Sequence, residues 1–302
     1  MSASLINDPK QAGERLKKGE IIIFPTETVY GLGASSLNYD SCNRIYKIKN
    51  RPIDNPLIIH VTNVESILEF SYIDSKYLES INELTPGPIS FIVQKKKEIF
   101  TAGVDTLAFR VPGSRLAREM LKYSGPVCAP SVNFSGRPSL TTLEDVKDEF
   151  LDLVDGILVG EEPEIGLEST VVDLSSEIPK YLRPGYLSFD TVKKYFPNIE
   201  LHSEIHLSPG MKYRHYSPNA KVSWIKNDEE ISEKDFAFIG FHSRVNAKEQ
   251  CLVSNNREYA LNLFHFFVKM DKKNISRIYC EMPLSGTLFD AIVNRIEKAI
   301  NK

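Results

Sequence analysis

Short apolar runs and helically spaced apolar residues both occur along this chain, and together they predict a mixture of strands and helices. A helix is expected over residues 9–18, because Asp8 can cap it, Pro9 suits its first position and Gly19 can end it. Up to residue 200, apolar runs predict strands at residues 21–24, 57–61, 89–93, 106–111, 127–131, 157–159, 170–174 and 180–183. Apolar residues three to four positions apart predict further helices at residues 41–50, 64–70, 75–84, 114–123, 143–151 and 189–195.

The order of these elements indicates the fold class. Strands and helices are mixed without strict alternation, which favours an α/β protein with a mixed twisted sheet. Residues 202–219 are polar and bracketed by prolines, as is typical of a linker. Beyond the linker, strands are expected at residues 221–225, 236–241 and 275–281, and helices at residues 257–269 and 287–300. The sequence therefore predicts a second, small α/β domain after the linker.

Composition and charge narrow the class of protein. The 302 residues carry 37 Lys+Arg against 40 Asp+Glu, a formal net charge of −3, which argues against non-specific coating of nucleic acid. The four cysteines are far apart and form no CxxC pair, so they predict reduced structural thiols and no zinc site. No apolar run approaches the roughly 20 residues of a membrane span, and the first residues lack the apolar stretch of a signal peptide. We therefore expect a cytoplasmic protein without a membrane partner.

The standard nucleotide and hydrolase signatures are missing. GLGASS at residues 31–36 lacks the third glycine of the dinucleotide fingerprint, and Walker A, HExxH and GxSxG motifs do not occur. The densest polar cluster is PTETVYGLG at residues 25–33, predicted as a loop directly after a strand. Its hydroxyl and carboxylate groups belong to Thr26, Glu27, Thr28 and Tyr30. Glycines in the same loop allow close approach of backbone to a ligand, although an ordinary polar turn is the alternative.

A cationic segment follows at the end of the helix predicted over residues 41–50. Arg44, Lys47 and Arg51 recur at helical spacing, and four cations lie within eight residues. They indicate either a seat for phosphate groups or a solvated helix face. His60 ends the next apolar strand, where a histidine is more often a core residue than a catalyst.

Polar or cationic groups also interrupt later strand ends. The segments are TLAFRVP with Thr106 and Arg110, APSVNFSGRPS with Ser131, Asn133 and Ser139, GLESTVVDL with Glu168, Ser169 and Thr170, and YLRPG with Arg183. Any one of these groups can be structural, since a buried arginine can simply pair with a carboxylate. Because burying several isolated cations is costly, the whole set predicts one cleft for an anionic ligand.

The ordered string of motifs resembles a known family. PTETVYGLG, KNRP with DNPLIIH, FRVP, APSVNFSGRPS, GLESTVVDL and LRPG are similar to the YrdC-like domain of threonylcarbamoyl-AMP synthases. SPGMKYRHYSP, followed by a small α/β domain, resembles the two-domain form of that family. The resemblance covers almost the whole chain. It implies a YrdC-like catalytic domain over residues 1–200, a linker over residues 201–219 and a small Rossmann-like C-terminal domain over residues 220–302.

The resemblance also implies an activity. Members of the family are nucleotidyltransferases that join L-threonine, bicarbonate and ATP into threonylcarbamoyl-AMP and pyrophosphate. The product passes to the tRNA threonylcarbamoyl transferase machinery, which modifies the adenosine next to the anticodon. Mg²⁺ is expected to accompany ATP, with no metal site on the protein itself. Direct binding of tRNA is left open.

Site residues follow from the resemblance by motif position. L-threonine is expected to contact Thr28, His60, Arg110, Ala129 and Ser169. ATP is expected to contact Arg51, Asn55, Thr106, Ser131, Ser139, Arg183, Tyr213 and Tyr216. Which linker tyrosine touches ATP is left open, and the cations and aromatic rings of the linker predict a lid over the cleft. No catalytic residue is assigned: His60, Glu27 or bicarbonate itself is the candidate general base.

Two alternatives come from other classes of protein. A carbamoyl-adenylate-handling domain of the hydrogenase-maturation type shares the YrdC-like fold, but the missing CxxC pairs argue against it. A non-catalytic RNA-binding module is the other, and the net charge of −3 argues against it.

Overall fold

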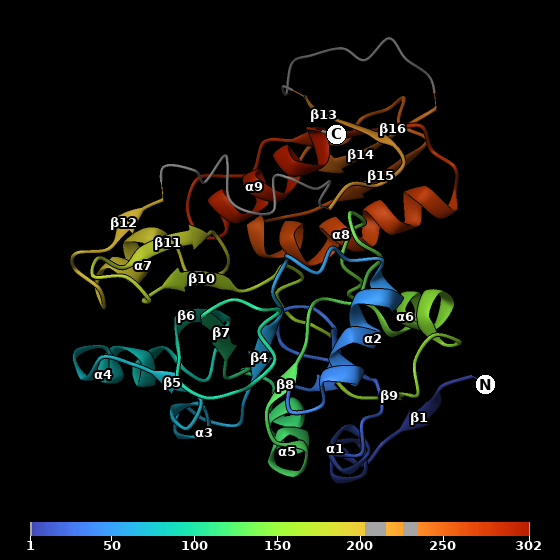
Figure 1. Cartoon of the computed structure of the whole chain (residues 1–302). Helices are drawn as coiled ribbons and strands as arrows, with labels where there is room; N and C mark the ends of the chain where they lie inside the picture. Colours follow the sequence, from blue (N-terminus) through green and yellow to red (C-terminus); the bar gives the residue numbers. More distant parts are fainter. Residues whose placement is uncertain (1, 203–215, 226–234, 302) are drawn as a thin grey trace.

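A computed structural model gives the fold and describes residues 2–202, 216–225 and 235–301 (Figure 1). Most of the predicted linker, including Tyr213, lies outside these residues. Figure 1 shows a large N-terminal part built on one sheet and a smaller C-terminal part, coloured orange to red, above it. The helix α8 (Asn256–Lys272) lies between the C-terminal sheet and the N-terminal part.

The N-terminal part is built on a mixed sheet. Its described strands run in the order β1-β9-β2-β3-β8-β4-β7-β6-β10-β11-β12, with β5 beside β6. Their bounds are β1 (Ser4–Ile6), β2 (Ile22–Phe24), β3 (Gly31–Ser35), β4 (Ile58–His60), β5 (Ser71–Tyr72), β6 (Ile89–Lys95), β7 (Thr106–Arg110), β8 (Val127–Cys128), β9 (Gly156–Leu158), β10 (Thr170–Asp173), β11 (Lys180–Arg183) and β12 (Glu200–Leu201). Parallel pairs such as β4–β7 alternate with antiparallel pairs such as β6–β7, so the predicted mixed sheet is confirmed.

Most helices of the N-terminal part begin at a residue whose side chain caps the first turn. They are α1 (Pro9–Lys17), α2 (Tyr39–Lys49), α3 (Glu65–Leu68), α4 (Ser75–Leu84), α5 (Arg115–Ser124), α6 (Leu143–Phe150) and α7 (Phe189–Lys193). The Asp8 side chain accepts the Lys10 N–H at 2.9 Å and caps α1, as the sequence predicts. Asn50 ends α2 in the left-handed region at φ 50°, just before Arg51. Arg51 therefore follows the helix instead of continuing it.

The core beneath the sheet is continuous. Ile23, Leu32, Ile59, Phe91 and Phe109 are fully buried in one hydrophobic cluster that spans the central strands. Such close-packed interiors hold strand ends in fixed positions. The polar residues at the ends of β4 and β7 are therefore presented on a rigid support.

The C-terminal part is a small parallel α/β domain. Its strands β13 (Lys221–Ile225), β14 (Phe236–Gly240), β15 (Glu249–Leu252) and β16 (Arg277–Glu281) run in the order β13-β16-β14-β15, and every described pairing is parallel. Helix α8 and helix α9 (Phe289–Ile300) complete it. This arrangement confirms the expected Rossmann-like α/β domain. None of the helices in the described part of the chain combines the length and the apolar character that a membrane crossing requires.

Helix α8 packs directly on the N-terminal part. At Gly166, which has φ +79°, an added Cβ would lie 2.5 Å from the Leu261 Cα atom, so the backbones touch here. Nearby, Asp145 of α6 accepts hydrogen bonds at 2.7 Å from His265 and from Lys272 of α8. The two parts therefore meet through backbone contact and buried charge.

Differences from the sequence prediction are confined to short elements. Residues 25–33 are not all loop, because β3 begins at Gly31, and the helix expected over residues 64–70 is the shorter α3. No strand was predicted over β3 itself, because its sequence GLGAS carries no apolar run. The short strands β1, β5, β12 and β15 were not predicted either. Each is an edge or two-residue strand, or alternates with exposed polar residues, so it carries no apolar run.

Candidate functional site

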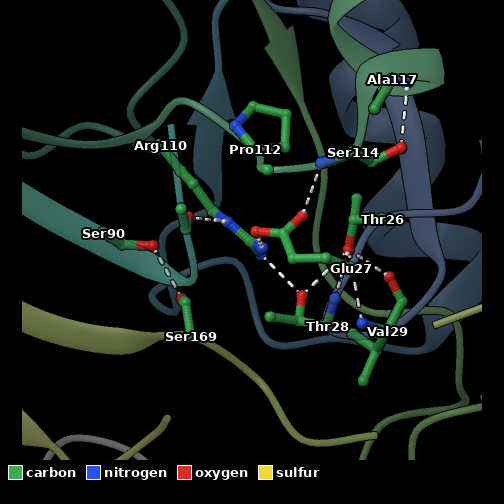
Figure 2. A network of polar contacts seen from close by, with 12 residues as sticks. Thr26, Glu27, Thr28, Val29, Ser90, Arg110, Pro112, Ser114, Ala117 and Ser169 are labelled. Carbon is green, nitrogen blue, oxygen red and sulfur yellow. Dashed lines mark hydrogen bonds and ion pairs between the residues drawn. The ribbon is translucent and has the colours of Figure 1, made fainter. Parts of the chain in front are cut away.

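Arg110, at the end of β7, is the centre of the first polar cluster (Figure 2). Its Nη1 donates to the Thr28 hydroxyl at 2.7 Å, its Nε donates to the Gly87 carbonyl at 3.3 Å, and its Nη2 forms an ion pair with Glu27. All of these side chains come from strand ends or from the loop after β2. Parallel pairing of β4 with β7 places His60 directly beside Arg110.

Glu27 fixes Arg110. Its second carboxylate oxygen accepts the Ser114 N–H at 3.1 Å, at the start of α5. Burial would raise the pKa of Glu27, but the Arg110 charge and the hydrogen bond from Gly113 outweigh burial and lower it. Glu27 is therefore ionised, and both of its carboxylate oxygens already accept hydrogen bonds. These contacts fit a role in orienting Arg110 better than the role of general base, for which Glu27 is one candidate in the sequence.

His60 is buried and uncharged. Its Nδ1 lies 3.3 Å from the Ile58 carbonyl, and its ring meets the Phe24 ring edge-on with centroids 6.0 Å apart. Burial and the Arg110 charge lower the pKa of His60 to about 3. In the tautomer that donates to Ile58, Nε2 carries the free lone pair.

Ser169 and Arg183 form a second cluster next to the first. The Ser169 hydroxyl lies 2.8 Å from the Ser90 hydroxyl and accepts from Arg183 Nη2 at 3.1 Å, while Arg183 Nε donates to the Ser169 carbonyl at 3.0 Å. Antiparallel pairing of β10 with β11 brings these residues together. Figure 2 shows Ser90 and Ser169 beside the Arg110 network.

Ser139 and Glu168 link this cluster to the C-terminal domain. Glu168 accepts from the Ser139 hydroxyl at 2.5 Å through one oxygen and from Arg295 Nε of α9 at 2.9 Å through the other. Burial would raise the pKa of Glu168, but the charges of Arg295 and Arg183 lower it. The sequence pattern predicts no role for Arg295. The available signal was the helical spacing that sets Arg295 on the apolar face of α9, with Ile292 and Ala299.

A buried lysine supports the loop that carries Ser131. The Lys49 ammonium donates to the carbonyls of Ser131 at 2.5 Å and Asn133 at 2.6 Å, and the Ser131 hydroxyl donates to the Asn133 side chain at 2.7 Å. Burial, with the nearby Arg51 charge, lowers the pKa of Lys49 well below its ordinary value. Lys49 was counted among the four clustered cations, but its individual role was not predicted.

Arg51 lies near Arg183 and Lys49, and apart from Arg44 of the preceding helix. Its Nε donates to the Asn55 carbonyl at 3.0 Å. Burial and the charge of Arg183 lower the pKa of Arg51, although Tyr46 and Tyr216 oppose this. Arg44 instead pairs with Asp155 at 3.1 Å on the surface. Only the end of the helix therefore contributes to a cationic site, not the whole face.

The remaining predicted site residues occupy different places. Ala129 is buried, and its N–H donates to Ile58 beside His60. Thr106 begins β7 while Arg110 ends it, so at about 3.3 Å per residue they lie about 13 Å apart along the strand. The pairing of β4 with β7 covers Ala108 to Arg110 and does not reach Thr106. The structure thus separates Thr106 from Arg110, and its contact with a nucleotide stays a prediction.

Tyr216 is the described end of the predicted lid. Its ring stacks on Phe264 of α8 with centroids 5.3 Å apart, and the guanidinium of Arg295 lies 5.2 Å from the ring centroid. Burial raises the pKa of Tyr216, with Glu168 contributing and the hydrogen bond with Arg183 opposing. Tyr213 lies outside the described residues.

The described residues provide no ready metal cage. No group of three or more His, Cys, Asp or Glu side chains among them is arranged to hold a metal ion. Glu27 and Glu168, the carboxylates of the two clusters, are both paired with arginines. The arrangement instead gathers guanidinium groups and hydroxyls, which bind carboxylate and phosphate.

Comparisons with known proteins extend this picture. The sequence profile of the Sua5/YciO/YrdC family, described as telomere recombination, matches residues 14–185. A profile described as the C-terminal domain of threonylcarbamoyl-AMP synthase matches residues 176–300. The threonylcarbamoyl-AMP synthase of Pyrococcus abyssi is 34% identical over 310 residues, which cover 94% of this chain and 91% of that protein.

Solved structures give the same result. The crystal structure of P. abyssi Sua5 complexed with L-threonine matches with a TM-score of 0.92 at 31% identity, covering 99% of this chain and 98% of that one. Full-length HypF in a phosphate- and nucleotide-bound form matches with a TM-score of 0.51 at 18% identity, covering 59% of this chain and 29% of that one. The likeness to HypF shows a shared fold alone.

Proposed function

This chain belongs to the Sua5/YciO/YrdC family in its two-domain threonylcarbamoyl-AMP synthase form, and we propose that it joins L-threonine, bicarbonate and ATP. It is an enzyme of the nucleotidyltransferase type, and its products are threonylcarbamoyl-AMP and pyrophosphate. The adenylate serves threonylcarbamoylation of tRNA next to the anticodon. The observation that carries the proposal is a buried arginine, Arg110, that Thr28 and Glu27 hold in one orientation. Two further arginines, Arg51 and Arg183, lie near each other in the adjacent cluster.

Arg110 suits the carboxylate of threonine. A guanidinium has more N–H donors than the contacts to Gly87, Thr28 and Glu27 use, so donors remain for a carboxylate. Glu27 holds the group in one orientation, which lowers the entropy cost of binding. The proposal assigns the amine and hydroxyl of the amino acid to the hydroxyls of Thr28, which contacts Arg110, and of Ser169, in the adjacent cluster.

Arg51 and Arg183 suit the nucleotide phosphates. Each donates hydrogen bonds to neutral groups, either a backbone carbonyl or a hydroxyl. Their two positive charges repel each other. Two guanidinium groups without a paired carboxylate between them bind an anion favourably. The proposal also assigns nucleotide contacts to Ser131 and Ser139, whose hydroxyls donate to Asn133 and Glu168 in this structure.

The chemistry requires positioning more than covalent catalysis. Bicarbonate takes up a proton and loses water to give carbon dioxide, and the neutral amine of threonine attacks that carbon and releases a proton, which gives an N-carboxylate. That carboxylate attacks the α-phosphorus, the bond to the bridging oxygen breaks, and pyrophosphate leaves. Charge accumulates on phosphate oxygens, where Arg51 and Arg183 stabilise it. The candidate acceptors of the amine proton are bicarbonate itself and His60 Nε2, whose pKa would rise only in part when the threonine carboxylate offsets the Arg110 charge, because burial also lowers it.

Under this proposal Mg²⁺ enters with ATP. Magnesium binds mainly to phosphate oxygens and water, with one or two carboxylates at most. The carboxylates of Glu27 and Glu168 are engaged by arginines, so the ion is held by the nucleotide rather than by a protein cage. It would offset negative charge on the phosphate chain.

The partners follow from the instability of the product. A mixed anhydride of this kind hydrolyses in water, so an acceptor in the same compartment must take it promptly. We place the enzyme in the cytoplasm, where it hands the adenylate to the tRNA threonylcarbamoyl transferase machinery. Direct binding of tRNA is left open.

Release of pyrophosphate from ATP tests the function. The full chain is assayed with threonine and bicarbonate together, and with each omitted in turn. Release that depends on both supports the synthase, and identification of threonylcarbamoyl-AMP by mass spectrometry completes the assignment. Binding of RNA without any turnover would favour the RNA-binding alternative and overturn the proposal.

A further inference from the structure

Helix α9 of the C-terminal domain is anchored inside the site. Arg295 is fully buried, donating through Nε to Glu168 and through Nη1 to the Pro184 carbonyl, both at 2.9 Å. Glu168 precedes Ser169 in the chain, and Pro184 follows Arg183. The helix is therefore fixed against the two segments that carry these site residues.

Lys298 lies one turn after Arg295, and residues three apart on a helix lie on the same face. Its ammonium is 5.9 Å from the centroid of the Tyr216 ring, to which Arg295 is also close. The ring itself is held by stacking on Phe264. Within the part of the chain that the structure describes, the ammonium of Lys298 has no hydrogen-bond or ion-pair partner. A half-buried amine thus faces the site with its donors unused.

The surroundings of Lys298 carry excess positive charge. Burial and the charges of Arg295 and Arg183 lower its pKa to about 8, while Glu168 acts in the opposite direction. Glu168 is already occupied by Ser139 and Arg295. The cations Arg183 and Lys298 therefore share no free carboxylate, and the environment favours an anionic ligand.

We propose that Lys298 is a further substrate-binding residue, supplied by the C-terminal domain, whose ammonium contacts the phosphate chain of the nucleotide between Arg183 and Tyr216. The proposal rests on the proposed function, since it takes ATP as the ligand. A lysine suits this place because its compact charge on a flexible stem follows a phosphate group whose position varies. The C-terminal domain then takes part in substrate binding as well as in packing.

Calorimetry of ATP binding without threonine tests the contact. Lys298→Met keeps the apolar stem and removes the charge, and we expect about a tenfold loss of ATP affinity at pH 7. Lys298→Arg should retain most of the affinity, and binding of adenosine should be the same in all variants. The matched control is Lys269→Met, which removes an exposed lysine from α8 and should bind ATP like the unmodified chain.

The pH dependence of ATP binding gives a second readout. The affinity of the unmodified chain should fall between about pH 7.5 and pH 9.5 as Lys298 loses its proton, whereas that of Lys298→Met should stay nearly flat. The groups facing Lys298 do not titrate in this window. Arg183 and Arg295 stay charged, the pKa of Glu168 is lowered, and that of Tyr216 is raised.

The outcomes separate this inference from the function. If a folded Lys298→Met chain binds ATP as tightly as the unmodified chain, Lys298 only packs against Tyr216 and the inference is wrong. An equal loss for adenosine would place the contact away from the phosphates and also overturn it. If the unmodified chain binds ATP through Lys298 but releases no pyrophosphate, the proposed function fails and the contact stands. A chain that binds no ATP overturns both.

Discussion

The carboxylate of Glu168 is shared between the Ser139 hydroxyl, at 2.5 Å, and Arg295 Nε, at 2.9 Å. The first partner belongs to the N-terminal domain and the second to the last helix of the chain. Both side chains of the ion pair are almost completely buried. One carboxylate therefore joins a predicted nucleotide-binding hydroxyl to the C-terminal domain.

Removing Arg295 should leave this carboxylate buried without a counter-charge. We expect Arg295→Met to lower the free energy of unfolding by about 3–5 kcal/mol. Urea unfolding followed by circular dichroism measures the change. The double variant Glu168→Gln with Arg295→Met should recover part of the loss, since neither charge remains. Glu168→Gln alone completes the cycle. If the loss of unfolding free energy in the double variant equals the sum of the losses in the two single variants, the residues are not coupled.

Arg110 should select threonine. Arg110→Ala should raise the concentration of threonine needed for half-maximal rate by tenfold or more, because a charge-assisted bond of about 1.5–3 kcal/mol is lost. Steady-state kinetics of pyrophosphate release give this value. ATP affinity without threonine should change much less. An equal loss of both affinities would place Arg110 on the phosphates instead.

Arg51 should contact the nucleotide, whereas Arg44 should not. Arg51→Ala is expected to weaken ATP binding about tenfold, and Arg51→Lys to restore it only in part, because a point charge does not replace a guanidinium fork. Arg44→Ala serves as the control, since Arg44 pairs with Asp155 on the surface. Calorimetry distinguishes the variants. Normal ATP binding by a folded Arg51→Ala chain would contradict the assignment.

Asp145 should make stability depend on pH in acid. Burial would raise its pKa, but hydrogen bonds from His265, Lys272 and Thr142 lower it from 3.8 to about 2. A lowered carboxyl pKa contributes stability that is complete above about pH 4 and is lost as the pH falls toward 2.

Compared with Asp145→Asn, the unmodified chain should thus be about 2 kcal/mol more stable at neutral pH, with the gap closing below pH 4. Urea titrations at several pH values measure this gap. Asp148→Asn is the control, because the Asp148 side chain is 52% exposed and its pair with Lys272 contributes little. A gap that persists at pH 2 would exclude the linkage.

Most of the fold could be predicted because its strands are apolar runs with distinct ends. The strand at β13 and the helix α4 match their predicted bounds, and α1 begins at its predicted cap. The strand β15 was missed because its exposed residues alternate with half-buried ones and leave no apolar run. A strand that is stabilised mainly by pairing at the edge of the folded sheet cannot be predicted from the local pattern of apolar residues.

The candidate site could be predicted only where local motifs carry it. Thr28, Arg110, Ser169 and Arg183 lie in polar segments beside apolar strands, and the structure brings them into adjacent clusters. The partner of Glu168 could not be found in this way, because Arg295 is 127 residues away on another domain. Long-range ion pairs depend on how two domains dock, and no spacing along one chain specifies that.

At Gly166 the backbone of the N-terminal domain contacts the backbone of α8, so a substitution at this one position can change how the two domains dock. Because the backbone of α8 lies where a side chain would begin, even the methyl group of alanine at this position must act as a wedge. Such a wedge would tilt α8 and, with it, the Phe264 ring that supports Tyr216, while every polar side chain of the site stays chemically intact. The position of the C-terminal domain could then be varied without changing any reactive group. The effect of domain docking on the enzyme could thus be distinguished from the effect of its side-chain chemistry.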